Sequence, residues 1–289
     1  MVINALNQYN MKTSLLNSDD MEIGITFKGR LISSLGDNIC LTPIIENLYH
    51  QKNELITVST LLPELFLNNP YVKDTVVNNN PRIVLFPSIR YEYNIIEYYA
   101  EQMEMDIPKG TAPKIYLSPD EIEYGKILLK EFEGFKKITI SLETGANCKT
   151  LRFEYIKPIL DKLKRNGYKL IAIGKESIEH KYEYDKSFIN KTTIREVSSI
   201  INQCDLYFGI DAGLYHIAAA LNVPQVVFFR NNESSNNSYP NTFFSNSRIK
   251  CPKDCLTTHL SVCMNNNRCM DNFDLDEYFN LVNKILENK

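Results

Sequence analysis

The order of strand-like and helix-like segments constrains the fold of this chain more than any other feature of its sequence. Short apolar runs such as residues 54–60 and 136–142 alternate with segments whose apolar residues recur at helical spacing, such as residues 93–105 and 151–166. Strands that alternate with helices favour parallel sheets, because each helix returns the chain to the same end of the sheet. The sequence therefore predicts an α/β protein with doubly wound, Rossmann-like parallel sheets.

A stretch rich in proline and glycine, near residues 106–125, separates two such alternating series. We expect a polar N-terminal extension over residues 1–22 and a Rossmann-like domain over residues 23–112. A second Rossmann-like domain, over residues 113–289, would include a Cys-rich segment at 251–269 and a C-terminal helix. Two such halves predict a cleft between the carboxyl ends of their sheets, where open α/β sheets bind ligands.

Gly36-Asp37 lies where the first half is expected to pass from a strand into a helix. Residues 30–35 are typical of a buried strand, and residues 38–49 are typical of an amphipathic helix. A carboxylate at that junction either caps the helix or stands at the mouth of the cleft, available for chemistry.

The second half has a matching junction at Asp211-Ala212-Gly213. The apolar run 206–210 predicts a buried strand, and the residues after Gly213 predict a helix. The N–H groups of the first turn of a helix can hold an anion, and His216 would reach the same anion as a donor. The alternative is an Asp N-cap followed by a partly exposed histidine.

One unit earlier, a predicted strand ends at Thr144-Gly145, and Lys149 follows before the next helix. A lysine near a glycine loop suits phosphate as a point charge. The alternative is an ordinary solvated lysine.

Four cysteines close to the C-terminus are spaced C-x3-C-x7-C-x5-C, at Cys251, Cys255, Cys263 and Cys269. Four thiolates fit a structural zinc or iron site, with no open position for catalysis. Reduced thiols or disulfides in a surface loop are the alternative. Cys40, by contrast, we assign to helix packing.

The bulk composition is that of an ordinary globular protein: 44% hydrophobic residues, 23% charged residues and a net charge of -3. This charge gives no reason to expect a nucleic-acid partner. The sequence has no apolar run of the roughly 18 residues that span a bilayer and no secretory leader pattern. We therefore expect a cytoplasmic protein with reduced thiols and without a transmembrane segment; a homo-oligomer is compatible with the sequence.

The motifs occur in the order seen in one known family. They are Leu35-Gly36-Asp37 with Thr42-Pro43, residues 68–77, residues 145–151, residues 192–229 and the cysteine cluster. With these motifs in this order, the chain resembles the heptosyltransferase family of GT-B glycosyltransferases. The resemblance covers roughly residues 28–289.

The resemblance implies a GT-B fold and inverting transfer of a sugar from a nucleotide diphosphate donor, with ADP-heptose favoured. The acceptor would be a hydroxyl of a surface glycan, a lipopolysaccharide core, another lipid-linked glycan or a protein. A lipid-linked acceptor would favour loose, peripheral association with the inner membrane.

The resemblance also assigns roles to residues. Asp37 would be the general base, and no metal would be needed for catalysis, because lysine and backbone dipoles would hold the diphosphate. Related protein-glycosylating members hold iron with four cysteines. The donor-binding residues implied are Lys149, Thr144, Gly145, Glu176, Asp211, Ala212, Gly213 and His216.

The chain departs from the family pattern at several positions. Ala212 stands where the family usually has Ser or Thr, Leu151-Arg152 replaces a Trp-Pro pair, and Glu143 adds a negative charge beside the expected phosphate loop. These changes favour an alternative: a degenerate, non-catalytic nucleotide-sugar-binding or assembly subunit of the same fold. An epimerase or hydrolase would need a further acid–base pair, which the sequence does not reveal.

Overall fold

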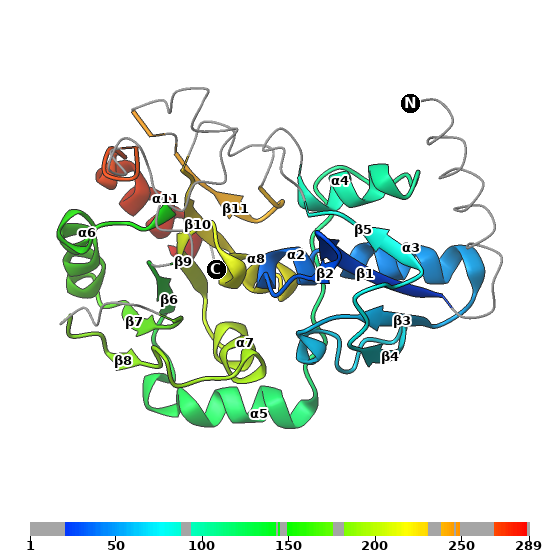
Figure 1. The fold of residues 1–289 in the computed structure, drawn as a ribbon. Helices are drawn as coiled ribbons and strands as arrows, with labels where there is room; N and C mark the ends of the chain where they lie inside the picture. Colours follow the sequence, from blue (N-terminus) through cyan, green and yellow to red (C-terminus); the bar gives the residue numbers. More distant parts are fainter. Residues whose placement is uncertain are drawn as a thin grey trace.

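Two sheets, each built mainly of parallel strands, form the framework of the protein (Figure 1). The computed structural model describes residues 21–87, 94–142, 144, 149–175, 182–230, 238–245, 247–248 and 269–287. No helix within these ranges has both the length and the apolar character that crossing a membrane requires.

The first sheet contains parallel strands followed by helices of the same half. Its parallel strands lie in the order β4 (Val72–Val76), β3 (Ile56–Ser59), β1 (Glu22–Phe27) and β5 (Ile83–Leu85). A short strand, β2 (Arg30–Leu31), pairs antiparallel with the end of β1. The helices of this half are α2 (Leu35–Ile39), α3 (Thr42–Lys52), the 3-10 helix η1 (Pro63–Leu65) and α4 (Ile95–Gln102).

The strand expected over residues 30–35 is wrong in its extent. Lys28 and Gly29 both have positive φ, so the chain reverses after β1, and only Arg30–Leu31 returns along it. The side-chain amide of Asn38 then donates to the carbonyl groups of Ile32 and Ser34, and α2 begins at Leu35. The predicted helix over 38–49 is therefore two helices, α2 and α3.

The second sheet is parallel throughout, as the pattern predicted. Its order is β11 (Thr242–Phe243), β10 (Gln225–Phe228), β9 (Leu206–Ile210), β6 (Lys137–Ser141), β7 (Lys169–Ala172) and β8 (Lys186–Ser187). Its helical elements are α5 (Pro119–Leu128), the 3-10 helix η2 (Lys130–Phe132), α6 (Phe153–Arg165), α7 (Ile194–Asn202), α8 (Gly213–Ala220) and α11 (Leu275–Glu287).

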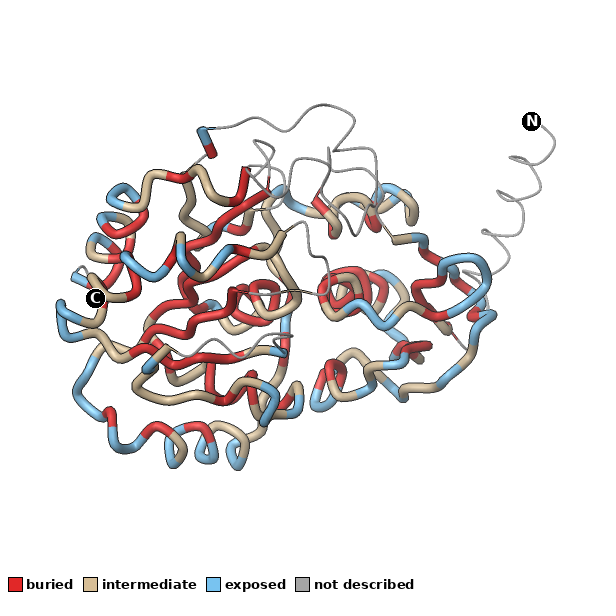
Figure 2. The backbone as a smooth tube through the Cα atoms, turned by 60° about the vertical axis from the view of Figure 1, so that its left-hand side comes forward, coloured by how far each residue is buried: buried red, intermediate tan, exposed pale blue. Residues whose placement is uncertain are grey.

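Alternate residues of the second sheet enter different hydrophobic clusters, as expected for strands covered on both faces. One face packs against α6 and α11, where the Tyr278 ring stacks on Phe228 at a centroid distance of 3.9 Å. The other face packs against α7 and α8, and this cluster continues into the first sheet. Figure 2 shows buried backbone running through both sheets. The predicted doubly wound α/β class is confirmed; the division at residues 112 and 113 stays a prediction.

Arg195, on α7, ties the two halves together below this shared cluster. Its guanidinium donates to both carboxylate oxygens of Glu121 in the first turn of α5, with Nε–Oε1 at 2.6 Å. It also donates to the backbone carbonyls of Tyr116 and of Glu64, which lies in η1. One buried side chain thus holds an element of each half.

Candidate functional site

The best candidate site lies at the carboxyl edge of the second sheet, between β6 and β9. The strand order reverses its direction of growth there, because β7 and β8 follow β6 on one side and β9, β10 and β11 lie on the other. Ligands of doubly wound sheets bind at such a switch point. Lys149 follows β6, Asp211 follows β9 directly, and Arg230 follows β10.

Lys149 and Asp211, both predicted as donor-site residues, meet at this edge. Lys149 Nζ lies 2.6 Å from Asp211 Oδ2 and donates to the Asp211 carbonyl at 3.2 Å. Burial by itself raises the pKa of the Asp211 carboxyl, but the positive charge and hydrogen bond of Lys149, with further contributions from His216 and Arg230, outweigh it, so the pKa falls below its ordinary value. Asp211 is therefore ionised at neutral pH and holds the ammonium group in place.

Ala212, rather than Asp211, is the N-cap of α8. Its backbone is extended, with φ -147° and ψ 178°, and it makes no side-chain cap hydrogen bond. The expectation of an Asp cap is therefore wrong. The N-terminus of α8 still directs its backbone N–H groups and the positive end of its dipole at the edge where Asp211 and Lys149 lie, as the anion-binding prediction requires.

The first half meets this edge through a close contact between α2 and α8, which lie side by side between the sheets (Figure 1). A Cβ on Gly213 would come within 2.4 Å of Leu35 Cδ2, and a Cβ on Gly36 within 2.8 Å of His216 Cδ2. Both positions therefore need glycine for the helices to approach. The contact brings Asp37, the residue after Gly36, close enough to His216 for its carboxylate to raise the pKa of that ring.

Asp37 is partly exposed and is the third residue of α2. Ser34 occupies the N-cap position, so Asp37 is not the cap of this helix. The hydroxyl group of Tyr99, on α4, donates to Asp37 Oδ1 at 3.1 Å. Burial, followed by the negative charge of Asp37, raises the pKa of Tyr99, which therefore stays a hydroxyl donor and orients the carboxylate.

His216 is buried, with 6% of its surface exposed, so the expectation of a partly exposed histidine is wrong. Its Nδ1 lies 2.7 Å from the hydroxyl oxygen of Tyr239, and its Nε2 lies 4.0 Å from Asp211 Oδ1. Burial lowers the pKa of His216 more than the carboxylates of Asp211 and Asp37 raise it. The ring is therefore neutral at neutral pH.

Several predicted site residues lie outside the described residues: Gly145, Glu176, Cys251, Cys255 and Cys263. Thr144 is described and is partly buried. Cys269, the remaining member of the cysteine cluster, is buried in the cluster beneath α6 and α11. Within the ranges that the structure describes, no three His, Cys, Asp or Glu side chains are grouped to hold a metal ion.

Three residues of this region were not predicted from the sequence: Tyr99, Arg230 and Tyr239. Arg230 had a signal, because it follows an apolar strand that runs parallel to the strand before Asp211. Tyr99 and Tyr239 had none, since their contacts come from segments 62 and 23 residues away from their partners in sequence.

Comparison with known proteins gives one family match. Residues 100–250 match the family described as "Glycosyltransferase family 9 (heptosyltransferase)". A search of curated proteins finds no significant match to the sequence.

Solved structures share the fold at low sequence identity. A glycosyl transferase family 9 protein from Veillonella parvula DSM 2008 has a TM-score of 0.75 at 14% identity, over 94% of this chain and 99% of that one. The iron-containing dodecameric glycosyltransferase TibC from enterotoxigenic E. coli H10407 has a TM-score of 0.71 at 13% identity, over 94% of this chain and 77% of that one. E. coli ADP-heptose lps heptosyltransferase II has a TM-score of 0.68 at 12% identity, over 93% of this chain and 99% of that one. The predicted GT-B fold is confirmed.

Proposed function

This chain belongs to glycosyltransferase family 9, the heptosyltransferase family, and we propose that it moves a sugar, with heptose favoured, from a nucleotide diphosphate donor to an acceptor hydroxyl group. The observation that carries the proposal is the contact between α2 and α8. It brings Asp37, from the first half, close enough to act electrostatically on His216, whose Nε2 lies 4.0 Å from Asp211 Oδ1 in the second half.

In the proposed reaction, Asp37 is the general base. It accepts the proton of the acceptor hydroxyl as that oxygen forms a bond to the anomeric carbon. The bond from the anomeric carbon to the diphosphate oxygen breaks at the same time, and the nucleoside diphosphate leaves with the electron pair. Attack on the face opposite to the leaving group inverts the anomeric configuration. Tyr99 holds the carboxylate in position for this step.

The diphosphate is proposed to bind at the N-terminus of α8, next to Lys149. The lysine charge and the helix N–H groups would stabilise the negative charge that develops on the leaving group, without a catalytic metal. TibC has been solved in complex with ADP-D-beta-D-heptose, which supports ADP-heptose as the donor. Gly145 and Glu176 remain proposed donor contacts on the strength of the family resemblance.

The acceptor is proposed to be a surface glycan, a lipopolysaccharide core or a protein, bound mainly by the first half. The relative heptosyltransferase II is named for transfer to lipopolysaccharide, which supports a lipid-linked glycan. Such an acceptor would place the enzyme in the cytoplasm, peripheral to the inner membrane.

A structural metal at the cysteine cluster is a separate proposal, supported by the iron-containing relative TibC. Cys269 is buried in the cluster beneath α6 and α11, on the opposite face of the sheet from α8, and Ser247 donates to its carbonyl group. This placement fits a metal that holds the chain in place and takes no part in transfer. Metal analysis of the purified protein should find about one iron or zinc per chain; folded protein without metal would contradict the proposal.

Replacing Asp37 by Asn tests the proposed function. Asp37→Asn keeps the shape of the side chain but removes the base, so sugar transfer should fall by about 100-fold or more while donor binding is kept. Transfer is measured by release of the nucleoside diphosphate from the sugar nucleotide in the presence of an acceptor extract. Asp74→Asn, an exposed carboxylate on β4, is the matched control and should leave the rate unchanged. Wild-type rates in Asp37→Asn would contradict the proposal.

A non-catalytic donor-binding subunit is the second candidate, and Ala212 is the observation that favours it. The N-cap of α8 has no hydroxyl to offer to phosphate, and its N-cap backbone is extended. Calorimetry with ADP, UDP, GDP and their sugar conjugates separates the two candidates when it is combined with the transfer assay. Binding with no turnover for any acceptor would favour the subunit, and turnover that Asp37→Asn abolishes would favour the enzyme.

A further inference from the structure

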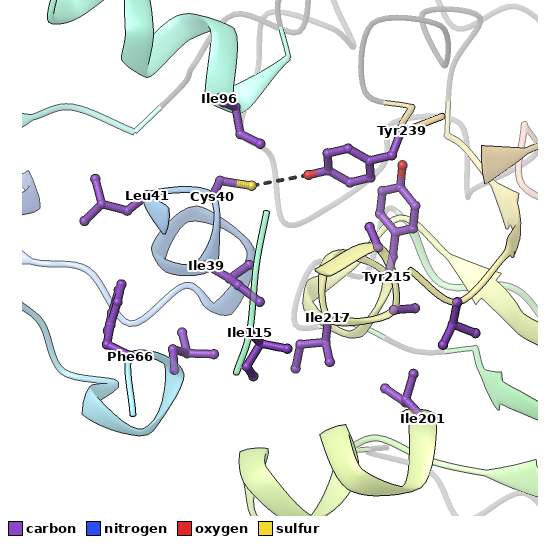
Figure 3. Packing of buried hydrophobic residues seen from close by; sticks show 14 of the residues in the cluster. Ile39, Cys40, Leu41, Phe66, Ile96, Ile115, Ile201, Tyr215, Ile217 and Tyr239 are labelled. Carbon is purple, nitrogen blue, oxygen red and sulfur yellow. Dashed lines mark hydrogen bonds between the residues drawn. The ribbon is translucent and has the colours of Figure 1, made fainter. Parts of the chain in front are cut away.

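A chain of hydrogen-bonding groups crosses from the first half of the protein to the second at His216. Cys40 follows α2, and its Sγ lies 3.4 Å from the hydroxyl oxygen of Tyr239 and 3.6 Å from His216 Nδ1. Figure 3 shows the Cys40 side chain directed at Tyr239 across the packed residues between the halves. Cys40 does pack in the core, as predicted, but it also reaches the donor-site histidine.

Tyr239 is held firmly in this arrangement. It is buried, its backbone N–H donates to Thr242 Oγ1 at 3.0 Å, and its carbonyl accepts from the Thr242 N–H at 2.9 Å. The Thr242 hydroxyl in turn donates to Gln225 Oε1, on β10, at 2.8 Å. The backbone of Tyr239 is therefore anchored to the second sheet.

The charges around His216 select one arrangement of protons along this chain. Asp211 is an ionised carboxylate 4.0 Å from Nε2, so a lone pair on Nε2 would face a negative charge, whereas an N–H there faces it favourably. With the proton on Nε2, Nδ1 must accept, and the Tyr239 hydroxyl donates to it. The tyrosine oxygen then accepts from the Cys40 thiol, which burial keeps protonated by raising its pKa.

We propose that Tyr239 is a positioning residue that fixes His216 as the Nε2–H tautomer aimed at the donor site, and that Cys40 orients Tyr239 from the other half of the protein. This inference rests on the proposed function for its consequence. A distance of 4.0 Å from Nε2 to Asp211 Oδ1 is longer than a hydrogen bond, so the N–H can be shared with a diphosphate oxygen of the donor. The opposite tautomer would present a lone pair to that oxygen and repel it.

The ring nitrogens of His216 report the tautomer directly. The chain has four histidines, so the spectrum of protein labelled with 15N-histidine is simple, and His216→Asn identifies the His216 signals. In wild type we expect an unprotonated Nδ1 and a protonated Nε2. Tyr239→Phe should convert them to signals averaged between both tautomers, and Cys40→Ala should shift them less, in the same direction.

Tyr215→Phe is the matched control. Tyr215 is equally buried in the same aromatic cluster, with its ring centroid 5.0 Å from that of His216, but its hydroxyl pairs with Thr242 and with the backbone of Tyr239, so its removal leaves the Tyr239 hydroxyl at His216 Nδ1. It should leave the His216 tautomer unchanged, so it controls for a general loosening of the core. ADP affinity should fall about tenfold in Tyr239→Phe and stay within twofold in Tyr215→Phe.

Two results would overturn the inference: a protonated Nδ1 in wild type, or His216 signals in Tyr239→Phe identical to those of wild type. The ring measurement needs no donor. Wild-type protein that keeps the Nε2–H tautomer but binds no nucleotide diphosphate would therefore overturn the proposed function and leave the positioning of His216 standing.

Discussion

Ala212 shows how one side chain can weaken a site that the surrounding backbone still provides. Ser, Thr, Asp and Asn are preferred at N-caps because their side-chain oxygen accepts from an N–H of the first helical turn. Ala212 has the extended backbone of an N-cap but no oxygen to offer. The helix end that is proposed to hold the diphosphate is therefore stabilised less than it could be.

Restoring a hydroxyl at this position should strengthen both the helix and the site. Ala212→Ser is expected to raise the free energy of unfolding by about 1 kcal/mol. It should also raise the affinity for ADP, since the hydroxyl adds a donor to phosphate. Chemical denaturation and calorimetry measure the two effects. Ala220→Ser, at the last residue of α8, is the control and should show neither gain.

The contact between α2 and α8 is the element-scale feature on which the site depends. Two short helices from different halves pack through glycines, with Gly36 against the His216 ring and Gly213 against Leu35. Because the approach is so close, a single methyl group is enough to disturb it. The position of Asp37 relative to Asp211 depends on this contact.

Gly36→Ala should push the helices apart. Its Cβ would lie 2.8 Å from His216 Cδ2 and 3.0 Å from Nε2, and the loss of stability should be roughly 1–3 kcal/mol. Transfer should fall more than donor binding, because the methyl group displaces both Asp37 and the His216 ring, whereas Lys149 and Asp211 stay in place. Ser33→Ala, an exposed residue just before α2, is the control. Unchanged denaturation midpoints in Gly36→Ala would show that the helices are not in close contact.

The sequence predicted the long elements of the second half well, because segments such as residues 206–210 and α7 have strong apolar periodicity and clear turn signals. It missed β1, although Ile23, Ile25 and Phe27 alternate with non-apolar residues, because the strand is only six residues long. The neighbouring strand was extended in its place, over residues 30–35. The pairing of Lys149 with Asp211 followed from strand order. The partners Tyr99 and Tyr239 did not, because only tertiary packing brings them to the site.

At the scale of the whole molecule, Arg195 allows a test of how strongly the two halves are held together. The hydrogen bonds that Arg195 donates to its carboxylate lower the pKa of Glu121 more than burial raises it. A folded-state pKa below the unfolded value means that this pair stabilises the protein above the ordinary carboxylate pKa. The stabilisation is lost as the pH falls through the folded-state value.

Arg195→Gln should therefore lose stability in a pH-dependent way. The free energy of unfolding should fall by about 3 kcal/mol at pH 7, because Glu121 and two backbone carbonyls lose their donor. Below about pH 4 Glu121 becomes protonated, so the difference in free energy of unfolding between the variant and wild type should become smaller. Denaturation midpoints across pH measure it. Arg248→Gln breaks an exposed pair with Asp274 and should cost less than about 1 kcal/mol. Equal losses in the two variants would contradict the structural role of Arg195.

The hydrophobic cluster that runs from β1 through Ile115 and Ile217 to α7 belongs to neither half alone. In Figure 3 Ile39, Ile115, Ile217 and Ile201 of this cluster lie between helices of both halves. A fragment holding only one half would leave its share of that layer in water, at a cost of about 25 cal/mol for each Å² of apolar surface. The two halves are therefore expected to unfold together, in a single calorimetric transition. A protease should likewise find either both halves folded or both unfolded.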